Sequence, residues 1–299
     1  MQKQRVYAFD SQQLTMFQTC PQSYYFSHLR HLETRTYRKG IGKGKVLHKA
    51  YEFFYNARIE GKDQAACVKA GMLGLQMEAV KEKLPLDDLQ LCMLKFASYC
   101  TYHMNDLYYP LKTELGFSLV LYEDPEVMIL YEGRIDLIAR LLHNNQVIWV
   151  DHKNYLIKSS KPEFYTNQFL GYTWAIWQAF GKDAALQGIL DNTWMAPSLA
   201  PKDSHEMFMG NYLVGQLRNW EKQAIKSTIE MTKLYDATTE EVSYSSKTYN
   251  FDLQRHSSCN MSKFGPCQFL PICHSDTEKA AMYQIKTKFK EKDEIWKAW

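Results

Sequence analysis

Residues 137–150 restrict the fold of this chain more than any other stretch. Apolar runs at 137–142 and 147–150 flank the polar segment 143–146. This pattern predicts two antiparallel strands joined by a turn. Asp136 precedes the first run and Asp151 follows the second. The chain is therefore expected to contain a β-hairpin that offers two carboxylates.

The predicted hairpin also carries a lysine. Asp151 and Lys153 are two positions apart, so on a strand they point to the same face. Carboxylates hold hard divalent cations, and a neighbouring ammonium group can position or activate a water molecule. These groups suit metal-assisted hydrolysis of a phosphodiester. The alternative is a solvated or ion-paired strand end, because short motifs of this kind recur by chance.

Two predicted helices supply further candidates. His48 lies near the first turns of an apolar-periodic segment that opens at Gly44. Gln168 and Tyr172 are four positions apart and share one face of a helix. The alternatives are a capped or core histidine and an ordinary amphipathic helix.

These residues form an ordered set of motifs. They are, in chain order, a helical histidine, G-x-x-D, D-x-K and Q-x-x-x-Y, at positions 48, 133–136, 151–153 and 168–172. The set resembles the PD-(D/E)XK nuclease superfamily and, within it, the RecB-type nucleases. The resemblance implies an α/β fold with a restriction-endonuclease-like core. In that core a central mixed β-sheet is flanked by helices, with a helical insertion and a cysteine-ligated terminal staple.

The resemblance also implies a role for each matched residue. His48, Asp136 and Asp151 are expected to bind Mg²⁺ or Mn²⁺, with the backbone carbonyl of His152 as a further ligand. Lys153 is expected to be the catalytic lysine. The Q-x-x-x-Y pair is expected to order the site and contact DNA.

Seven cysteines give a second signal. The N-terminus lacks the apolar segment of a signal peptide, so disulfides are not expected. Cys259, Cys267 and Cys273 lie in a late stretch rich in polar residues, Gly and Pro. Three thiolates need a fourth for a tetrahedral site.

Residues 19–26 resemble the opening of RecB-type nucleases in which one early and three late cysteines bind a [4Fe–4S] cluster. The resemblance implies that such a cluster joins Cys20 to Cys259, Cys267 and Cys273. A structural zinc site is the second interpretation, and unrelated buried thiols are the third. The other cysteines lie in helical sequence and are expected in the core: Cys67, Cys92 and Cys100.

A basic segment precedes the predicted histidine ligand. The net charge of the chain is only +3, but residues 30–49 hold seven Lys and Arg residues against a single acidic one. Interleaved glycines would let the backbone approach phosphates. The segment is not a phosphate-binding loop of the Walker type, because Val46 stands where Ser or Thr is required. The residues expected to contact DNA are Arg38, Lys39, Lys43 and Lys45. A solvated flexible loop is the alternative.

We expect one elaborated nuclease domain over residues 1–299. It comprises a helical region over 46–110, broken at residues 84–85, a catalytic core over 111–200, and a cluster-binding segment over 250–299 joined to Cys20. Helices are predicted over 11–32, 162–180 and 212–235, and further strands over 114–122, 127–131 and 186–195. Residues 278–299 predict an amphipathic helix packed on the core, or a DNA-facing arm.

Together these features favour a metal-dependent DNA nuclease, an exonuclease rather than an endonuclease, in recombination, repair or DNA processing. The alternative is a cluster-stapled DNA-binding or assembly subunit whose nuclease activity is weak or depends on a partner. No ATPase motif is present, so a helicase, annealing or recombination partner would be a separate protein. No apolar stretch reaches membrane-spanning length, which favours a cytoplasmic setting. Small nucleases of this kind are common in viral genomes, which favours a viral or mobile-element origin. The sequence leaves the oligomeric state open.

Overall fold

The structure, a computed structural model, describes residues 4–34, 41–105, 107–155, 163–200 and 203–240, and the short segments 267–269, 273, 283–285 and 296–297. Its strands are β1 (Arg5–Asp10), β2 (Leu32–Thr34), β3 (Tyr108–Glu123), β4 (Val127–Leu141), β5 (Val147–Tyr155), β6 (Ala184–Trp194), β7 (His205–Asn211), β8 (Tyr283–Ile285) and β9 (Trp296–Lys297). Its helices are α1 (Ser11–Thr19), α2 (Pro21–Tyr24), α3 (Ile41–Ile59), α4 (Gln64–Lys81), α5 (Leu86–Tyr102), α6 (Asn167–Phe180) and α7 (Val214–Glu240).

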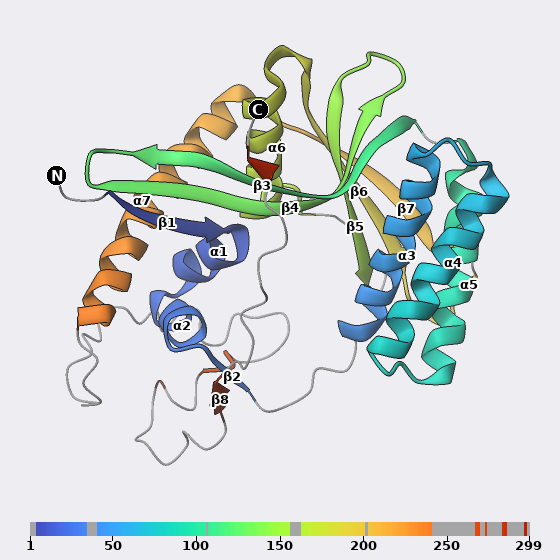
Figure 1. Ribbon diagram of the computed structural model, residues 1–299, viewed down its shortest axis with the longest axis horizontal. Coiled ribbons are helices and arrows are strands. Elements are labelled where there is room, and N and C mark those ends of the chain that lie inside the picture. Colours follow the sequence, from blue (N-terminus) through green and yellow to red (C-terminus); the bar gives the residue numbers. More distant parts are fainter. Residues whose placement is uncertain are drawn as a thin grey trace. The chain divides into compact units, whose positions relative to one another are not determined.

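The strands form one mixed sheet and one short antiparallel pair. The seven-stranded sheet runs in the order β7-β6-β5-β4-β3-β9, and β1 pairs with β4 outside this path. Strands β5 and β6 are parallel, whereas β4 and β5 are antiparallel. Helices flank the sheet, so the expected α/β class with a mixed central sheet is confirmed (Figure 1).

Contacts divide the chain into two compact units. One contains Met1–Tyr37, Ser118–Glu132 and Asn219–Ile295, and the other contains Arg38–Phe117, Gly133–Arg218 and Trp296–Trp299. All candidate residues from His48 to Tyr172 belong to the second unit, whereas Cys20, Cys267 and Cys273 belong to the first. The expectation of one elaborated nuclease domain stays a prediction.

The predicted hairpin is formed by β4 and β5. Leu137 pairs with Val150, and Arg140 pairs with Val147. Asn145, with φ 61°, occupies the left-handed region in the turn, which Asn tolerates better than most residues. Strand β5 has neighbours on both sides, which explains why its first six residues are all buried.

Three helices, α3, α4 and α5, lie side by side (Figure 1, blue to cyan) and pack against one another and the sheet. Their shared core includes Cys67, Cys92 and Cys100, all buried as expected. Among the described helices, none combines the length and apolar character needed to cross a membrane.

Helix α6 packs on β5 and β6. The rings of Trp149 and Phe169 stack with centroids 5.0 Å apart, and Trp149 Nε1 donates to Thr173 Oγ1 at 2.8 Å. The Thr166 side chain accepts from Phe169 N and caps the helix. The helix therefore begins at Asn167, and the predicted start at residue 162 was too early.

Other boundaries also differ from the predictions. Strand β3 begins at Tyr108, before the predicted boundary at residue 111, and the buried Tyr108 hydroxyl lies 2.9 Å from Tyr55 OH of α3. The sheet also includes β1, which was not predicted. The predicted helix over 11–32 is interrupted at Cys20, where Pro21 starts a new turn, and its π-helical continuation ends at Leu29. In segment 278–299 the described residues are strands β8 and β9, so the expectation of a helix there was wrong for them.

The glycine-rich basic segment is helical where the structure describes it. Helix α3 begins at Ile41, so Gly42 and Gly44 lie in its first turns instead of in a loop. Each glycine disfavours a helix by about 1 kcal/mol. Complete burial of Val46 and Leu47 offsets this cost, since a fully buried aliphatic side chain contributes about 1.5–3 kcal/mol.

Gly188 on β6 provides a test of packing next to the hairpin. An ideal Cβ at Gly188 would lie 1.9 Å from Trp149 Cε2. Gly188→Ala is therefore expected to lower the free energy of unfolding by about 1–3 kcal/mol or more, because the buried indole has to shift. Denaturant unfolding would measure this. Gly215→Ala is the control, since its Cβ would meet nothing within 4 Å. Equal midpoints for the two variants would contradict the packing argument.

Candidate active site

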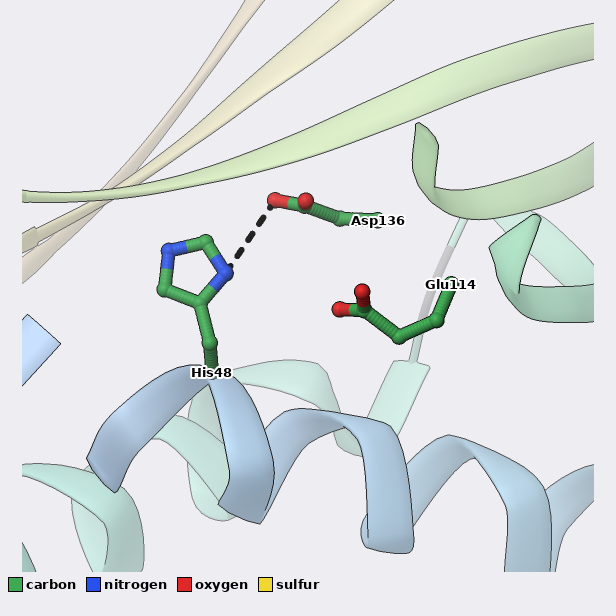
Figure 2. Close-up of side chains that lie close together, drawn as sticks. All are labelled: His48, Glu114 and Asp136. Carbon is green, nitrogen blue, oxygen red and sulfur yellow. Dashed lines mark ion pairs between the residues drawn. The ribbon is translucent and has the colours of Figure 1, made fainter. Parts of the chain in front are cut away.

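Three side chains from three elements converge in the second unit. They are His48 on α3, Glu114 on β3 and Asp136 on β4, and one donor atom from each lies within 4.8 Å of the others. His48 Nδ1 is 3.4 Å from Asp136 Oδ2, and Figure 2 shows all three side chains pointing toward one another. An imidazole and two carboxylates form a donor set that suits a divalent cation.

Glu114 is the residue that sequence reasoning missed as a site residue. Its φ of 47° places a non-glycine residue in the left-handed region within a strand. Such a conformation costs about 1–3 kcal/mol and is concentrated at functional sites. The Arg134 guanidinium approaches the Glu114 carboxylate at 3.8 Å. The only signal in the sequence was an acidic residue at the start of a predicted strand.

The electrostatics of this group favour a cation. Burial raises the pKa of Glu114 to about 7, and repulsion from Asp136 and Glu52 adds to the rise. Burial likewise raises the pKa of Asp136 to about 6, against the lowering effect of Lys153. Burial lowers the pKa of His48, which keeps its imidazole neutral and able to donate a lone pair. A bound cation would stabilise the ionised carboxylates.

A second cluster joins the remaining predicted residues. Lys153 Nζ lies 2.8 Å from Asp151 Oδ2, so the two side chains share a face as expected. Gln168 Nε2 donates to Asp151 Oδ1 at 3.1 Å and to Tyr172 OH at 3.0 Å. Tyr172 OH in turn donates to the Arg134 carbonyl. Helix α6 therefore ties the D-x-K strand to the middle of β4.

Asp151 differs from the three converging donors because it is paired with an ammonium group, that of Lys153. Burial raises the pKa of Asp151 to about 6, Lys153 opposes this rise, and Asp136 adds to it. For Lys153, burial lowers the pKa, but attraction to Asp151 and Asp136 outweighs it and the net pKa is raised. Lys153 therefore remains an ammonium ion. The predicted role of Asp151 as a metal ligand stays a prediction.

His152 contacts the site through its backbone and its side chain. Its N–H donates to Asp136 Oδ2 at 2.9 Å. A hydrogen bond from His48 to the His152 backbone raises the pKa of His48, although burial has the larger and opposite effect. Hydrogen bonding that favours the protonated imidazole identifies the acceptor as the carbonyl. The predicted role of the His152 carbonyl as a metal ligand stays a prediction.

The predicted DNA-contacting lysines are paired with carboxylates. Lys43 Nζ lies 2.8 Å from Asp88, and Lys45 Nζ lies 2.8 Å from Glu82. Surface ion pairs contribute only about 0–1 kcal/mol, so phosphates could replace these partners. Contact with DNA stays a prediction for both. Arg38 and Lys39 lie outside the described residues.

Three of the four predicted cluster ligands can be located. Cys20 is buried, while Cys267 and Cys273 are partly buried. Cys267 Sγ lies 3.4 Å from Ser23 Oγ, one turn beyond Cys20. The Sγ atoms of Cys20, Cys267 and Cys273 do not all lie within 4.8 Å of one another, unlike the donor atoms of the His48 group. Their spacing therefore gives no support to a single zinc ion. Cys259 lies outside the described residues.

Comparison with protein-family models decides the family. Residues 11–274 match the PD-(D/E)XK nuclease superfamily. The chain belongs to this superfamily. Nucleases of this superfamily use divalent metals such as Mg²⁺ or Mn²⁺, and the His48, Glu114 and Asp136 donors fit such an ion. No curated protein matches the chain.

Cation binding at this PD-(D/E)XK site should depend on pH. Glu114 and Asp136, with pKa values of about 7 and about 6, must lose protons to bind an ion. We expect the apparent Mn²⁺ affinity to rise between about pH 5 and about pH 8, with proton release. Calorimetry at pH 6 in buffers of different ionisation enthalpy would measure this release. Binding without proton uptake by the buffer would contradict it.

The raised pKa values of Glu114 and Asp136 also make the stability of the metal-free protein depend on pH. The folded-state values lie above the unfolded values of about 4, so the folded chain binds protons more readily. The stability these carboxyls contribute is therefore present below about pH 4 and lost as pH rises through about 6 to 7. Mn²⁺ should restore stability at neutral pH.

Proposed function

We propose that the protein is a RecB-type DNA exonuclease acting in recombination, repair or DNA processing. The convergence of His48, Glu114 and Asp136 within 4.8 Å is the observation that carries the proposal. Membership of the PD-(D/E)XK superfamily supports a metal-dependent nuclease. A helicase, annealing or recombination protein would be its partner.

In this proposal the converging donors and the cluster around Lys153 have different roles. His48, Glu114 and Asp136 hold Mg²⁺ or Mn²⁺, with Asp151 and the His152 carbonyl as further ligands. The bound cation would polarise the scissile phosphate and lower the pKa of a water molecule. Lys153 remains an ammonium ion and orients the attacking water or the phosphate. The products would carry 5′-phosphate and 3′-hydroxyl ends.

Gln168 is the residue that connects the two functional groups of the D-x-K strand. Its Oε1 accepts from Lys153 Nζ at 3.3 Å, while its Nε2 donates to Asp151 at 3.1 Å. One amide therefore restrains both the carboxylate and the ammonium. Tyr172, hydrogen-bonded to Gln168 and to the Arg134 carbonyl, restrains this amide in turn. We assign both residues to ordering the site.

The decisive experiment uses end-labelled linear DNA, single- and double-stranded, beside a covalently closed circle. With Mn²⁺ the protein should degrade the linear substrates from an end and leave the circle intact, and EDTA should stop the reaction. Asp151→Ala should be inactive, while Asp183→Ala, at an exposed position, should retain activity. Cutting of the circle would replace the exonuclease proposal with an endonuclease. DNA binding without cleavage would favour the binding-subunit alternative.

We further propose that Cys20, Cys259, Cys267 and Cys273 bind a [4Fe–4S] cluster. Early and late segments meet within the first unit: β2 pairs with β8, and the rings of Phe26 and Phe269 lie 5.6 Å apart. The short distance from Cys267 to Ser23 also supports the proposal. Joining such distant segments through one centre would restrict the unfolded chain strongly.

Anaerobic purification with iron, sulfide and zinc analysis would test the cluster. We expect visible absorption and stoichiometric iron, and we expect Cys273→Ala to lose colour and thermal stability together. Cys92→Ala is the control, because this buried cysteine in α5 should affect stability without affecting colour. Bound zinc without iron would favour the second interpretation, and a metal-free, colourless protein would contradict both.

A further inference from the structure

A fully buried polar network lies behind the candidate metal site. Tyr99 on α5, His152 on β5 and Asp191 on β6 are at most 2% exposed. Tyr99 OH lies 3.0 Å from both Asp191 Oδ2 and His152 Nε2. His103 Nε2 approaches the same Asp191 oxygen at 2.9 Å. This Tyr99–Asp191 pair has no part in the function proposed above.

The hydrogen bonds of Tyr99 fix the position of one proton, since its hydroxyl contacts Asp191 Oδ2, His152 Nε2 and, at 2.8 Å, Tyr55 OH, and its oxygen can accept two of these bonds. A tyrosine hydroxyl has one proton, and an ionised carboxylate can only accept. Tyr99 therefore donates to Asp191, and His152 must donate its Nε2 proton to Tyr99 for both bonds to exist. In a neutral imidazole this leaves Nδ1 without a proton and with a free lone pair.

The unprotonated nitrogen faces the metal site. His152 Nδ1 is 3.9 Å from Asp136 Oδ2, the oxygen that lies 3.4 Å from His48 Nδ1. The Tyr51 ring stacks on the His152 ring at 4.7 Å and restrains its plane. His152 also lines the same pocket as the three converging donors.

We propose that the His152 side chain is an additional metal ligand, presented through Nδ1 by the positioning residues Tyr99 and Asp191. Two ligands at about 2.1 Å from one ion can lie up to about 4.2 Å apart, which accommodates the 3.9 Å separation from Asp136. His152 is not among the donors that lie within 4.8 Å of one another, so its ring has to move closer to His48 and Glu114 when the ion binds. Hydrogen bonding of the other ring nitrogen is the usual means of orienting a ligating histidine. The proposal rests on the metal site of the proposed function.

A second imidazole changes which cation the site prefers. Oxygen donors alone suit Mg²⁺, whereas imidazole donors favour first-row transition metals. With both His48 and His152 as ligands, the site should bind Mn²⁺ more tightly than Mg²⁺. Loss of the His152 ligand should weaken Mn²⁺ binding more than Mg²⁺ binding.

The tautomer can be measured in the metal-free protein. Imidazole ¹⁵N chemical shifts and their couplings to ring protons distinguish protonated from unprotonated nitrogens. We expect His152 to carry its proton on Nε2 in the wild type and to lose this preference in Tyr99→Phe. A wild-type proton on Nδ1 would overturn the proposal, whether or not the protein cleaves DNA.

Metal affinity provides the second measurement. Calorimetric titration with Mn²⁺ should show binding about 10-fold weaker or more in Tyr99→Phe, the range found when such outer partners are removed. Tyr108→Phe is the matched control, because it also removes a buried hydroxyl, one that bonds to Tyr55 OH, which in turn bonds to Tyr99 OH. Circular dichroism and melting temperature would verify that both variants are folded.

The outcomes separate this proposal from the proposed function. Unchanged Mn²⁺ affinity in folded Tyr99→Phe, or equal losses in both tyrosine variants, would remove His152 Nδ1 from the ligand set even if the wild type is an active nuclease. Wild-type protein that binds Mn²⁺ as expected but cleaves no DNA would count against the nuclease proposal alone.

Discussion

Lys153→Met should reduce DNA cleavage by about 10²–10³-fold, the range found when one preorganised hydrogen-bond donor is removed from an active site, while the fold is retained. Lys153 lies 2.8 Å from Asp151, and the carboxylates around it raise its pKa and keep it charged. Methionine has a similar length and no charge, so the variant removes the ammonium with little change in packing. The loss should fall on kcat, because the proposed role is in the chemical step.

The measurement is single-turnover cleavage of end-labelled DNA with saturating Mn²⁺. Lys182→Met is the matched control, since Lys182 is exposed and far from the D-x-K motif in sequence. Mn²⁺ titration would verify that the metal site persists in Lys153→Met. Cleavage within tenfold of the wild-type rate would exclude Lys153 from the chemistry.

Asp136→Asn should abolish detectable Mn²⁺ binding and lower cleavage by about 10³-fold or more, because metal catalysis contributes several kcal/mol to the barrier. Asp136 Oδ2 stands at the centre of the site, bonded to the His152 N–H and 3.4 Å from His48 Nδ1. Asparagine keeps the shape of the side chain and removes the negative charge. The variant therefore offers the cation a neutral amide oxygen, which binds a divalent cation more weakly than a carboxylate oxygen does.

The same variant should not destabilise the metal-free protein at about pH 8. Burial raises the pKa of Asp136 to about 6, so at that pH the wild type holds a carboxylate in an unfavourable, buried position. A neutral amide removes this cost. Thermal melting without metal should therefore show equal or higher stability for Asp136→Asn. A large fall in melting temperature would mean that lost activity reflects misfolding.

Glu114→Gln is the informative companion to Asp136→Asn. Glu114 shares the converging donor group, so the substitution should also weaken Mn²⁺ binding. Its effect would establish whether the strained residue of β3 belongs to the metal site. Unaltered Mn²⁺ affinity in Glu114→Gln, beside a loss in Asp136→Asn, would limit the ligands to the residues that the motifs identify.

The site holds three carboxylates with raised pKa values, of which Asp151 is buried and Glu114 and Asp136 are partly buried, so its metal-free state is unfavourable. Glu114, Asp136 and Asp151 all have raised pKa values, and burial is the largest cause for each. A bound cation would relieve this cost, which couples metal affinity to protein stability. Stability in Mn²⁺ and in EDTA should therefore differ most at neutral to alkaline pH.

The sequence by itself determined the elements that carry local periodicity. The hairpin of β4 and β5, the shared face of Asp151 and Lys153, and the i, i+4 pair on α6 were all foreseen. Each depends on residues within a few positions of one another, where side-chain spacing follows directly from strand or helix geometry.

The tertiary structure decided what sequence spacing does not encode. Glu114 joins the site because a left-handed residue interrupts strand alternation and α3 brings His48 opposite it. The helical start of α3 depends on burial that overrides glycine propensity. The Tyr99–Asp191 pair joins residues 92 positions apart through packing of α5 and β6. Contacts between distant segments depend on how complete elements pack, and no local pattern specifies that packing.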